Sequence, residues 1–142
     1  MAYAPETEAV EICRDLIRID TSNYGDDSGP GERAAAEYVA ASLAEVGIES
    51  EIIESMRGRA SVVARWGNQS SSRPGLLVHG HLDVVPAQAD DWTVDPFAGE
   101  IVDGYLFGRG AVDMKDFDAM LLSVVPARQR PRVDPHPANQ QV

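Results

Sequence analysis

The stretch Gly75-Leu-Leu-Val-His-Gly-His-Leu-Asp-Val-Val-Pro86 contains the strongest indication of the fold. Its apolar start is typical of a strand that is buried on both faces of a parallel or mixed sheet. In an extended strand, His79, His81 and Asp83 share one face. Ligand sites in open α/β sheets gather at the carboxyl ends of strands. The stretch therefore predicts a central strand that ends in two imidazoles and a carboxylate.

A histidine followed two residues later by a carboxylate suits a metal centre. The imidazole of His81 can bind the ion while the carboxylate of Asp83 orients that imidazole from behind. The alternative is that a histidine at the end of a strand is an ordinary surface residue with its hydrogen bonds satisfied. From this stretch alone, both interpretations stay open.

The residues around this stretch alternate between helical and extended patterns. Apolar residues at spacings of three and four predict helices over 6–19 and about 32–46, and Gly47 is placed to end the second helix. Short strands are predicted over 49–54 and 60–66, and Asp103-Gly104 between apolar residues is a hairpin signal. A third helix begins near Asp113. Helices that alternate with strands indicate an α/β layered fold.

Length and composition exclude several classes of protein. The 142 residues suffice for one domain, and 44% of them are hydrophobic. A net charge of -11 argues against nucleic acid and against an anionic membrane surface as partners. The start of the chain has no pattern of a signal peptide, and no apolar run is long enough to cross a membrane. The single Cys13 fits a core thiol in a reducing compartment, so we expect a cytoplasmic protein.

The stretch from Gly108 to Lys115 is a second candidate for chemistry. Its two glycines, Gly108 and Gly110, let the backbone approach a neighbour closely, and Asp113 follows just before the third helix. A structural alternative is that Asp113 caps this helix, with Asp116 three residues later in the position of a capping box. Taken by itself, this stretch favours the cap.

The two candidate stretches together resemble a known family. The motifs are His-Gly-His-Leu-Asp-Val-Val-Pro (79–86), Trp-Thr-Val-Asp-Pro-Phe (92–97) and Asp-Gly-Tyr-Leu-Phe-Gly-Arg-Gly-Ala-Val-Asp-Met-Lys (103–115). In order and separation they resemble the co-catalytic zinc metallopeptidases and deacylases. That family includes aminoacylases, acetylornithine deacetylase, succinyl-diaminopimelate desuccinylase, carnosinase-like dipeptidases and glutamate-releasing carboxypeptidases of the carboxypeptidase G type. The resemblance runs from about residue 6 to residue 125.

The resemblance implies a role for three residues. His81 would ligate one metal, Asp113 would bridge two metals, and Asp83 would be the catalytic-site carboxylate that orients His81. It gives no metal role to His79, Lys115 or Asp116, and it implies no other cofactor. The implied metal is zinc in a two-metal site, with cobalt or manganese as possible substitutes. The implied fold is a three-layer α/β sandwich with a mixed, mostly parallel sheet.

The implied reaction is hydrolysis of an amide bond in a small peptide or an N-acyl amino acid. Members of the family add a Glu-Glu pair, a further acidic ligand and a distant histidine, which this sequence lacks after Asp113. We expect the domain that carries dimerisation in the family to be absent as well. We therefore expect an incomplete N-terminal part of the catalytic domain, inactive by itself. The alternative is a small non-catalytic binding or interaction protein that reuses the scaffold.

The last residues break the pattern of the chain. Residues 1–125 are expected to form the catalytic part, and residues 126–142 a tail with several prolines and arginines. Pro126 stands where the apolar stripe of the third helix is still running, and a helix interior disfavours proline by about 3 kcal/mol. The sequence therefore predicts that the helix ends there and that the tail is disordered. An incomplete sheet would also expose an edge and favour aggregation.

Overall fold

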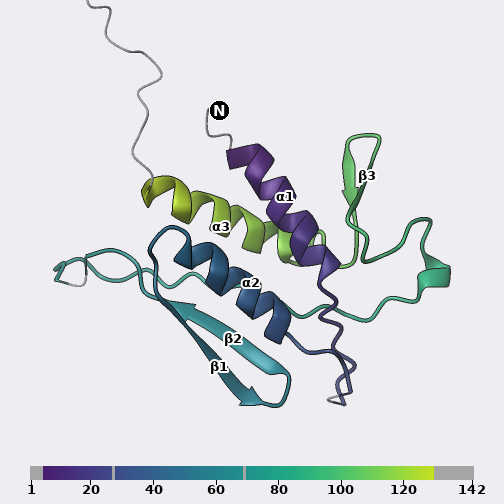
Figure 1. Cartoon of the computed structure of the whole chain (residues 1–142), viewed down its shortest axis with the longest axis horizontal. Helices are drawn as coiled ribbons and strands as arrows, with labels where there is room; N and C mark the ends of the chain where they lie inside the picture. The colour runs from purple at the N-terminus through teal and green to yellow at the C-terminus, as the bar shows by residue number, and fades with distance from the viewer. Residues whose placement is uncertain (1–4, 27, 69, 130–142) are drawn as a thin grey trace, which may run out of the picture.

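The fold consists of three helices and two small hairpins. The structure is a computed structural model that describes residues 5–26, 28–68 and 70–129. Helix α1 and helix α3 lie side by side, and α2 covers one face of the first hairpin (Figure 1). The elements, in chain order, are α1 (Pro5–Arg18), α2 (Arg33–Ala44), β1 (Ser50–Met56), β2 (Arg59–Ala64), a 3-10 turn η1 (Ala89–Asp91), β3 (Glu100–Val102), β4 (Tyr105–Phe107) and α3 (Lys115–Gln129).

The first two helices confirm the predictions made from apolar spacing. Helix α1 buries Cys13, Leu16 and Ile17, so Cys13 is the core thiol that the pattern indicated. Helix α2 ends at Ala44, and Gly47 adopts a φ of 74° just beyond it. Glycine populates this left-handed region without steric strain, which is why it can follow the end of a helix.

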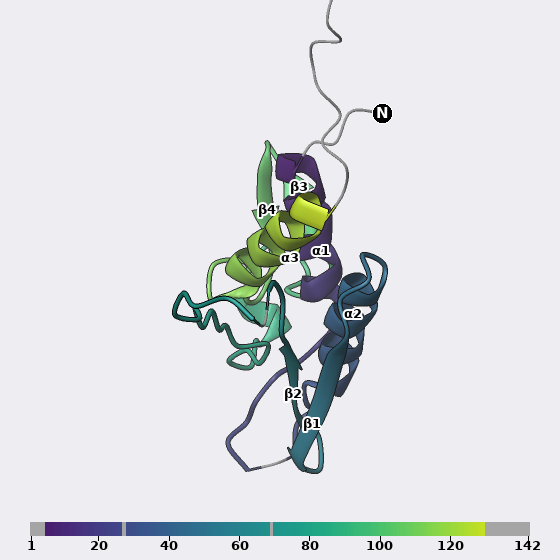
Figure 2. The same cartoon turned by 90° about the vertical axis from the view of Figure 1, so that its left-hand side faces the viewer.

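Both hairpins are antiparallel and local. Strands β1 and β2 pair from Ser50↔Ala64 to Glu54↔Ala60. Strands β3 and β4 are joined by Asp103 and Gly104, whose φ values of 52° and 82° belong to the two-residue turn that the sequence predicts. Figure 2 shows the second hairpin beside α1 and α3, away from the first hairpin.

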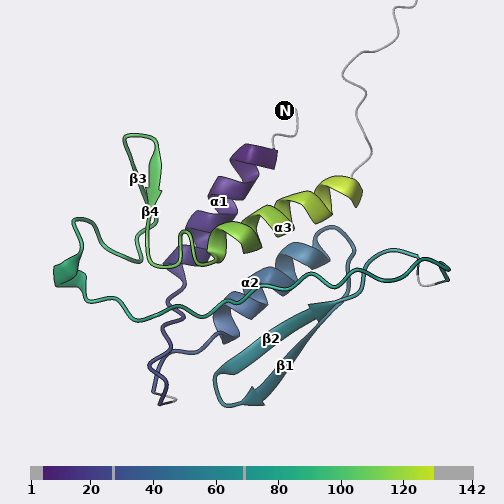
Figure 3. The same cartoon turned by 180° about the vertical axis from the view of Figure 1, so that it is seen from behind.

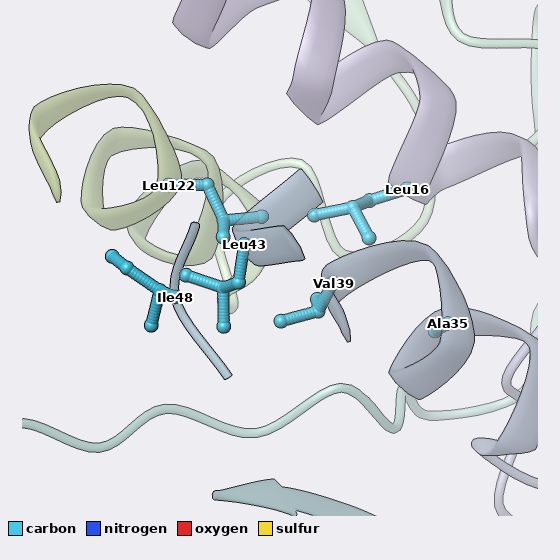
Figure 4. Packing of buried hydrophobic residues seen from close by; sticks show 6 residues of the cluster. All are labelled: Leu16, Ala35, Val39, Leu43, Ile48 and Leu122. Atoms are coloured by element: carbon cyan, nitrogen blue, oxygen red, sulfur yellow. The ribbon is translucent and has the colours of Figure 1, made fainter. Parts of the chain in front are cut away.

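The core forms where the helices meet. A cluster of buried apolar side chains joins α1, α2 and α3 with the residues just after α2 (Figure 4). Its members are Leu16, Ala35, Val39, Leu43, Ile48 and Leu122. A second, smaller cluster of Cys13, Ile17 and Ala119 lies between α1 and α3. Burial of these side chains is the main favourable contribution to folding. None of the helices in the described part of the chain is long and apolar enough to span a bilayer.

The predicted central strand is not a strand in the structure. Residues 75–83 run in an extended path past α2 without a ladder of hydrogen bonds (Figure 3), and Leu76 and Leu77 are 88% and 84% exposed. The prediction of burial on both faces is therefore wrong for this chain. The physical reason is that such a strand needs a backbone neighbour on each side, and the described residues supply only a single parallel bridge, Ser22↔Val84.

The mixed α/β character of the fold is confirmed, whereas the three-layer sandwich stays a prediction. The described residues form two separate two-stranded antiparallel sheets. A mostly parallel sheet would have to be built around the extended path of 75–83, which lacks strand partners here.

Helix α3 continues past Pro126 and ends at Gln129. The prediction that Pro126 ends the helix is therefore wrong. A proline removes one backbone hydrogen bond to the preceding turn and crowds that turn, which disfavours a helix there but does not prevent one. The rest of the predicted tail, residues 130–142, lies outside the described residues.

Candidate functional site

The loop after α1 is joined to the backbone at the end of the extended segment by three hydrogen bonds. The backbone N–H of Val84 donates to the carbonyl of Thr21 over 3.1 Å, and the N–H of Asn23 donates to the carbonyl of Val84 over 2.9 Å. The hydroxyl of Thr21 donates to the carbonyl of Leu82 over 2.6 Å. Because Thr21 and Ser22 are buried, this junction fixes the position of Asp83 relative to α1.

The structure brings His81 and Asp113 together from the two sequence motifs. The Nε2 atom of His81 lies 3.0 Å from Oδ1 of Asp113. On the other side of the ring, Nδ1 lies 3.0 Å from the backbone carbonyl of Asp83 and 3.3 Å from its Oδ1 atom. Both ring nitrogens therefore face oxygen acceptors, and all three residues with an implied role are in contact.

These acceptors change the protonation of His81. Partial burial disfavours the imidazolium, but the hydrogen bonds to Asp83 and Asp113 outweigh it and raise the pKa of His81 above its usual value. A divalent ion on Nε2 would take the place of that proton, because a histidine ligand binds metal as the neutral imidazole.

The carboxylate of Asp83 is held by polar side chains from two other segments. Its Oδ2 atom accepts a hydrogen bond of 2.8 Å from Nδ2 of Asn23 and lies 3.4 Å from Nη2 of Arg59. Partial burial disfavours the charged form, but the hydrogen bond from Asn23 and the charges of His81 and Arg59 lower the pKa of Asp83. Asp83 is therefore ionised and oriented at neutral pH.

The glycines of the second motif pack the loop before α3 against the protein. A Cβ atom on Gly110 would lie 2.6 Å from Val84, and one on Gly108 would overlap with Ile17. The prediction of a close backbone approach is confirmed, and the neighbours are side chains of the core. This packing carries the loop to the position where Asp113 meets His81.

Asp113 does not act as the helix cap that its position suggested. Helix α3 begins two residues later, at Lys115, and the Asp113 side chain is 85% exposed in contact with His81. The peptide bond between Asp113 and Met114 is cis. Asp116 accepts a hydrogen bond from the N–H of the next residue, Phe117, rather than closing a capping box with Asp113.

Two buried charged residues beside the site were not predicted. Lys115, fully buried, donates from Nζ to the carbonyls of Leu16 (2.7 Å) and Ile19 (2.9 Å) at the end of α1, and burial lowers its pKa to about 8. Asp118 is also buried, and burial raises its pKa to about 6. The weak signal in the sequence was the position of both charges at the start of an apolar helix.

Asp118 packs against Gly80, which lies between the two histidines. A Cβ atom on Gly80 would overlap with Oδ1 of Asp118, so only glycine leaves room for this approach. Asp118 lies in the first turn of α3, where a negative charge interacts favourably with the helix dipole, but this position does not account for its burial. His79, on the other side of Gly80, is exposed.

The three candidate residues line a cavity of about 310 Å³. His81, Asp83 and Asp113 share its wall with Asn23 and with the loop over 108–112. Imidazole and carboxylate are donor groups that zinc accepts. Within residues 5–26, 28–68 and 70–129, however, no three side chains of His, Cys, Asp or Glu come together as a set that could hold a metal ion.

Comparisons with known proteins agree with the motifs. A model of "Peptidase family M20/M25/M40" matches residues 77–138. The chain is 35% identical over 131 residues to a probable succinyl-diaminopimelate desuccinylase of Staphylococcus epidermidis, covering 91% of this chain and 30% of the relative. It is 39% identical over 109 residues to succinyl-diaminopimelate desuccinylase 2 of a Ruegeria species, covering 76% of this chain and 26% of the relative.

The fold agrees as well. Human carnosine dipeptidase 1 superposes with a TM-score of 0.63 at 24% identity, covering 89% of this chain and 30% of that protein. The chain thus spans about 30% of the length of the proteins that it matches. The resemblance predicted from the motifs is confirmed: over that part of their length, this chain is similar to proteins of peptidase family M20/M25/M40 and to the succinyl-diaminopimelate desuccinylases.

Proposed function

We propose that this chain supplies part of the active site of a metal-dependent hydrolase of amide bonds. The observation that carries the proposal is the 3.0 Å approach of His81 Nε2 to Asp113 Oδ1, which joins the two motifs of the family. His81 and Asp113 would be two ligands of one metal site. Asp83, on the other side of the imidazole, would be the carboxylate that orients His81.

The donor chemistry fits zinc, with cobalt or manganese as substitutes. We propose His81 as a terminal ligand and Asp113 as the bridging ligand of a two-metal site. When bound, the metals would lower the pKa of a water molecule and polarise the scissile carbonyl. Asp83, which is ionised and held by Asn23, would keep His81 in the orientation that ligation requires.

We further propose that the described residues do not hydrolyse a substrate by themselves. A catalytic zinc site has about three protein ligands, and hydrolysis also needs a general base. His81 and Asp113 provide two ligands. The fold would need additional residues as well. Residues 75–83 require neighbouring strands, which a three-layer mixed sheet would supply.

The substrate class that we propose is an N-acyl amino acid or a small peptide. The matched relatives carry the names succinyl-diaminopimelate desuccinylase and carnosine dipeptidase, which denote an acyl-amino acid and a dipeptide substrate. A cytoplasmic location is part of the proposal and is supported by the single buried thiol of Cys13.

Metal binding by the 142-residue chain tests the ligand assignment. Titration with Co²⁺, followed by visible absorption and calorimetry, should show weak binding that His81→Ala and Asp113→Asn each reduce by about 10-fold or more. His79→Ala is the matched control, since it removes an exposed imidazole two residues from His81. Equal loss of binding in all three variants would contradict the assignment.

A chimera tests the reaction. This chain would replace the matching section of the Ruegeria desuccinylase, to which it is 39% identical, and hydrolysis of N-succinyl-diaminopimelate would be followed. We expect an active chimera that loses activity with His81→Ala or Asp113→Asn and keeps it with His79→Ala. A folded, active chimera that tolerates His81→Ala would exclude the proposed role.

A non-catalytic binding protein is the second candidate. The observation that favours it is the lack of any set of three metal-donor side chains in the described part of the chain. This candidate predicts that the chain binds no Co²⁺ and that a folded chimera is inactive. The hydrolase proposal predicts the reverse for both measurements.

A further inference from the structure

Lys115 is the only lysine of the sequence, and its side chain is fully buried. Its Nζ atom donates hydrogen bonds to the backbone carbonyls of Leu16 (2.7 Å) and Ile19 (2.9 Å). Leu16 belongs to the last turn of α1 and Ile19 follows the helix, where carbonyls lack regular helical partners and carry partial negative charge. A buried ammonium is costly unless such acceptors hold it. The side chain therefore ties the start of α3 to the end of α1.

The backbone of Lys115 closes the turn that carries Asp113. Its N–H donates to the carbonyl of Gly110 over 2.9 Å, and Asp113 lies inside the turn that this bond closes. A Cβ atom on Gly110 would lie 3.2 Å from Cδ of Lys115, so the turn packs against the apolar stem of the lysine. The packing of Gly108 and Gly110 fixes where the turn begins, whereas the ammonium of Lys115 fixes where it ends.

The segment that receives Lys115 also holds the backbone next to His81. Residues 16–21 lead from the end of α1 to Thr21, which is fully buried. The hydroxyl of Thr21 donates to the carbonyl of Leu82, the residue after His81, over 2.6 Å. One short segment is therefore bonded to the neighbour of His81 on one side and to Lys115 on the other.

We propose that Lys115 is a positioning residue that holds Asp113 opposite His81, with residues 16–21 as the common frame and Thr21 as its counterpart on the His81 side. The inference rests on the proposed function in taking His81 and Asp113 as ligands. The ammonium suits this role because its unbranched stem reaches from α3 to α1 and its three N–H groups can serve two carbonyls. An apolar side chain could fill the same space but would leave both carbonyls without this donor.

The charge of Lys115 separates positioning from electrostatics. An ammonium near a metal site repels a divalent cation, so electrostatics alone predicts that Lys115→Met strengthens Co²⁺ binding. Positioning predicts binding that is weaker by about 10-fold, because Asp113 loses its fixed place. Lys115→Met removes the ammonium and keeps an unbranched apolar stem. Thr21→Val replaces the hydroxyl by a methyl group and should also weaken Co²⁺ binding by about 10-fold.

A double-mutant cycle shows whether Lys115 acts through Asp113. In an Asp113→Asn background, Lys115→Met should change the Co²⁺ affinity by less than about 2-fold, since the ligand that it positions is already altered. Thr21→Val should likewise have little effect in a His81→Ala background. A general loosening of the fold predicts the same fold-change in both backgrounds. Affinities would be read from the shifts that paramagnetic Co²⁺ causes in NMR spectra, which remain measurable when binding is weak.

Hydrogen exchange tests the positioning without metal. If the ammonium holds the loop before α3, that loop opens more easily in Lys115→Met. The N–H of position 115 and that of Ala111, which bond within the loop, should then exchange about 10-fold faster than in wild type. If the ammonium only satisfied carbonyls of α1, these amides would keep their wild-type rates.

The ammonium can also be observed in the unaltered chain. Because Lys115 is the only lysine, labelling with ¹³C,¹⁵N-lysine gives a single ζ signal that needs no assignment. A group that is fully buried and bonded to two carbonyls should exchange its hydrogens slowly with water.

Arg18→Met is the matched control. Arg18 also lies at the end of α1, and its Nε atom donates to a backbone carbonyl, that of Ala98, over 3.1 Å. The variant therefore removes a cation bonded to a carbonyl away from Asp113. It should leave both the exchange of the loop amides and the Co²⁺ affinity unchanged. Thermal unfolding of each variant identifies any protein that has lost its fold.

Several outcomes would overturn the inference. Folded Lys115→Met that binds Co²⁺ as tightly as wild type or more tightly is one, and an equal loss of affinity in the Asp113→Asn background is another. Unchanged exchange of the loop amides is a third. Should wild type bind no Co²⁺, the proposed function fails, while hydrogen exchange still decides whether Lys115 holds the loop. If Lys115→Met does not fold, rapid exchange of the wild-type ammonium overturns the inference, whereas slow exchange together with the expected Thr21→Val cycle supports it.

Discussion

His81 Nε2 and Asp113 Oδ1 lie 3.0 Å apart although 32 residues separate them in the chain. The contact is made because the loop of residues 21–23 fixes one partner beside α1, while Gly108 and Gly110 pack the loop before α3 against Ile17 and Val84. Backbone contacts of the two loops therefore position the site, and they place the imidazole of His81 within hydrogen-bond distance of the carboxylate of Asp113.

This contact predicts a change in the pKa of His81. Asp113→Asn removes a negative charge beside Nε2, so the pKa of His81, which is raised in the folded chain, should fall toward its usual value. An NMR titration of the His81 ring protons measures the shift. Asp91→Asn removes a similar charge from the exposed turn η1 and should leave the titration unchanged. A His81 titration that is the same in Asp113→Asn would show that the contact is not made in solution.

The sign of the effect on stability follows from the same shift. Because the folded-state pKa of His81 is raised, protonated His81 stabilises the fold at pH values below the unfolded pKa of about 6.5. That contribution is lost as the pH rises through the folded pKa. Asp113→Asn should therefore reduce the free energy of unfolding at pH 5.5 more than at pH 8.5, as denaturant titrations at the two pH values would show.

Asp118 predicts the opposite kind of pH dependence. Burial raises its pKa from 3.8 to about 6, and its Oδ2 atom has no hydrogen-bond partner among the described residues. The folded state thus holds the proton more tightly than the unfolded state, so ionisation destabilises the fold increasingly between about pH 4 and pH 6. At about 1.4 kcal/mol per pKa unit, the penalty above pH 6 is roughly 3 kcal/mol.

The variant Asp118→Asn removes this penalty and nearly preserves the shape of the side chain. We expect its free energy of unfolding to exceed that of wild type by about 1–3 kcal/mol at pH 8, with no advantage below about pH 4. Urea denaturation across this pH range makes the measurement. Asp116→Asn, on the same helix, is the control and should give no comparable gain. A gain of equal size at every pH would rule out ionisation of Asp118 as the cause.

Two glycines with similar φ values allow the cost of backbone strain to be measured separately from the cost of steric crowding. Gly104 and Gly110 have φ values of 82° and 85°, but only Gly110 is crowded, with Val84 2.6 Å from the position of an added Cβ atom. Gly104→Ala should cost about 1–2 kcal/mol from backbone strain alone. Gly110→Ala should cost about 2–4 kcal/mol because overpacking is added to the same strain. Equal losses in denaturant unfolding would mean that the loop before α3 is not packed against Val84.

The helices and the second hairpin could be predicted because local sequence determines them. The apolar spacing of α1 and α2 and the Asp103-Gly104 turn depend on neighbouring residues, and the structure agrees with each. The contact of His81 with Asp113 was implied by the family motifs and not by any local pattern. Its geometry depends on residues 21–23, whose hydrogen bonds to residues 82–84 no local pattern predicts.

The features that the sequence predicted wrongly, or did not predict, have one physical cause in common. Burial of residues 75–78 and the partners of Lys115 and Arg59 depend on segments far away in the chain. Apolar residues in a row indicate that a strand can be buried, but the burial itself requires neighbouring strands. Likewise, no local pattern shows that a lysine in the first turn of α3 will reach the end of α1.

The exposed residues of the extended segment predict self-association. Leu76 and Leu77 are 88% and 84% exposed beside backbone groups without ladder partners, a combination that favours pairing between chains. Leu77→Lys should therefore reduce the sedimentation coefficient or the aggregate fraction at high protein concentration and change the free energy of unfolding by no more than about 0.5 kcal/mol. Leu122→Lys, at a buried position of the core, should instead unfold the chain. A wild-type chain that sediments as a monomer at all concentrations would contradict this prediction.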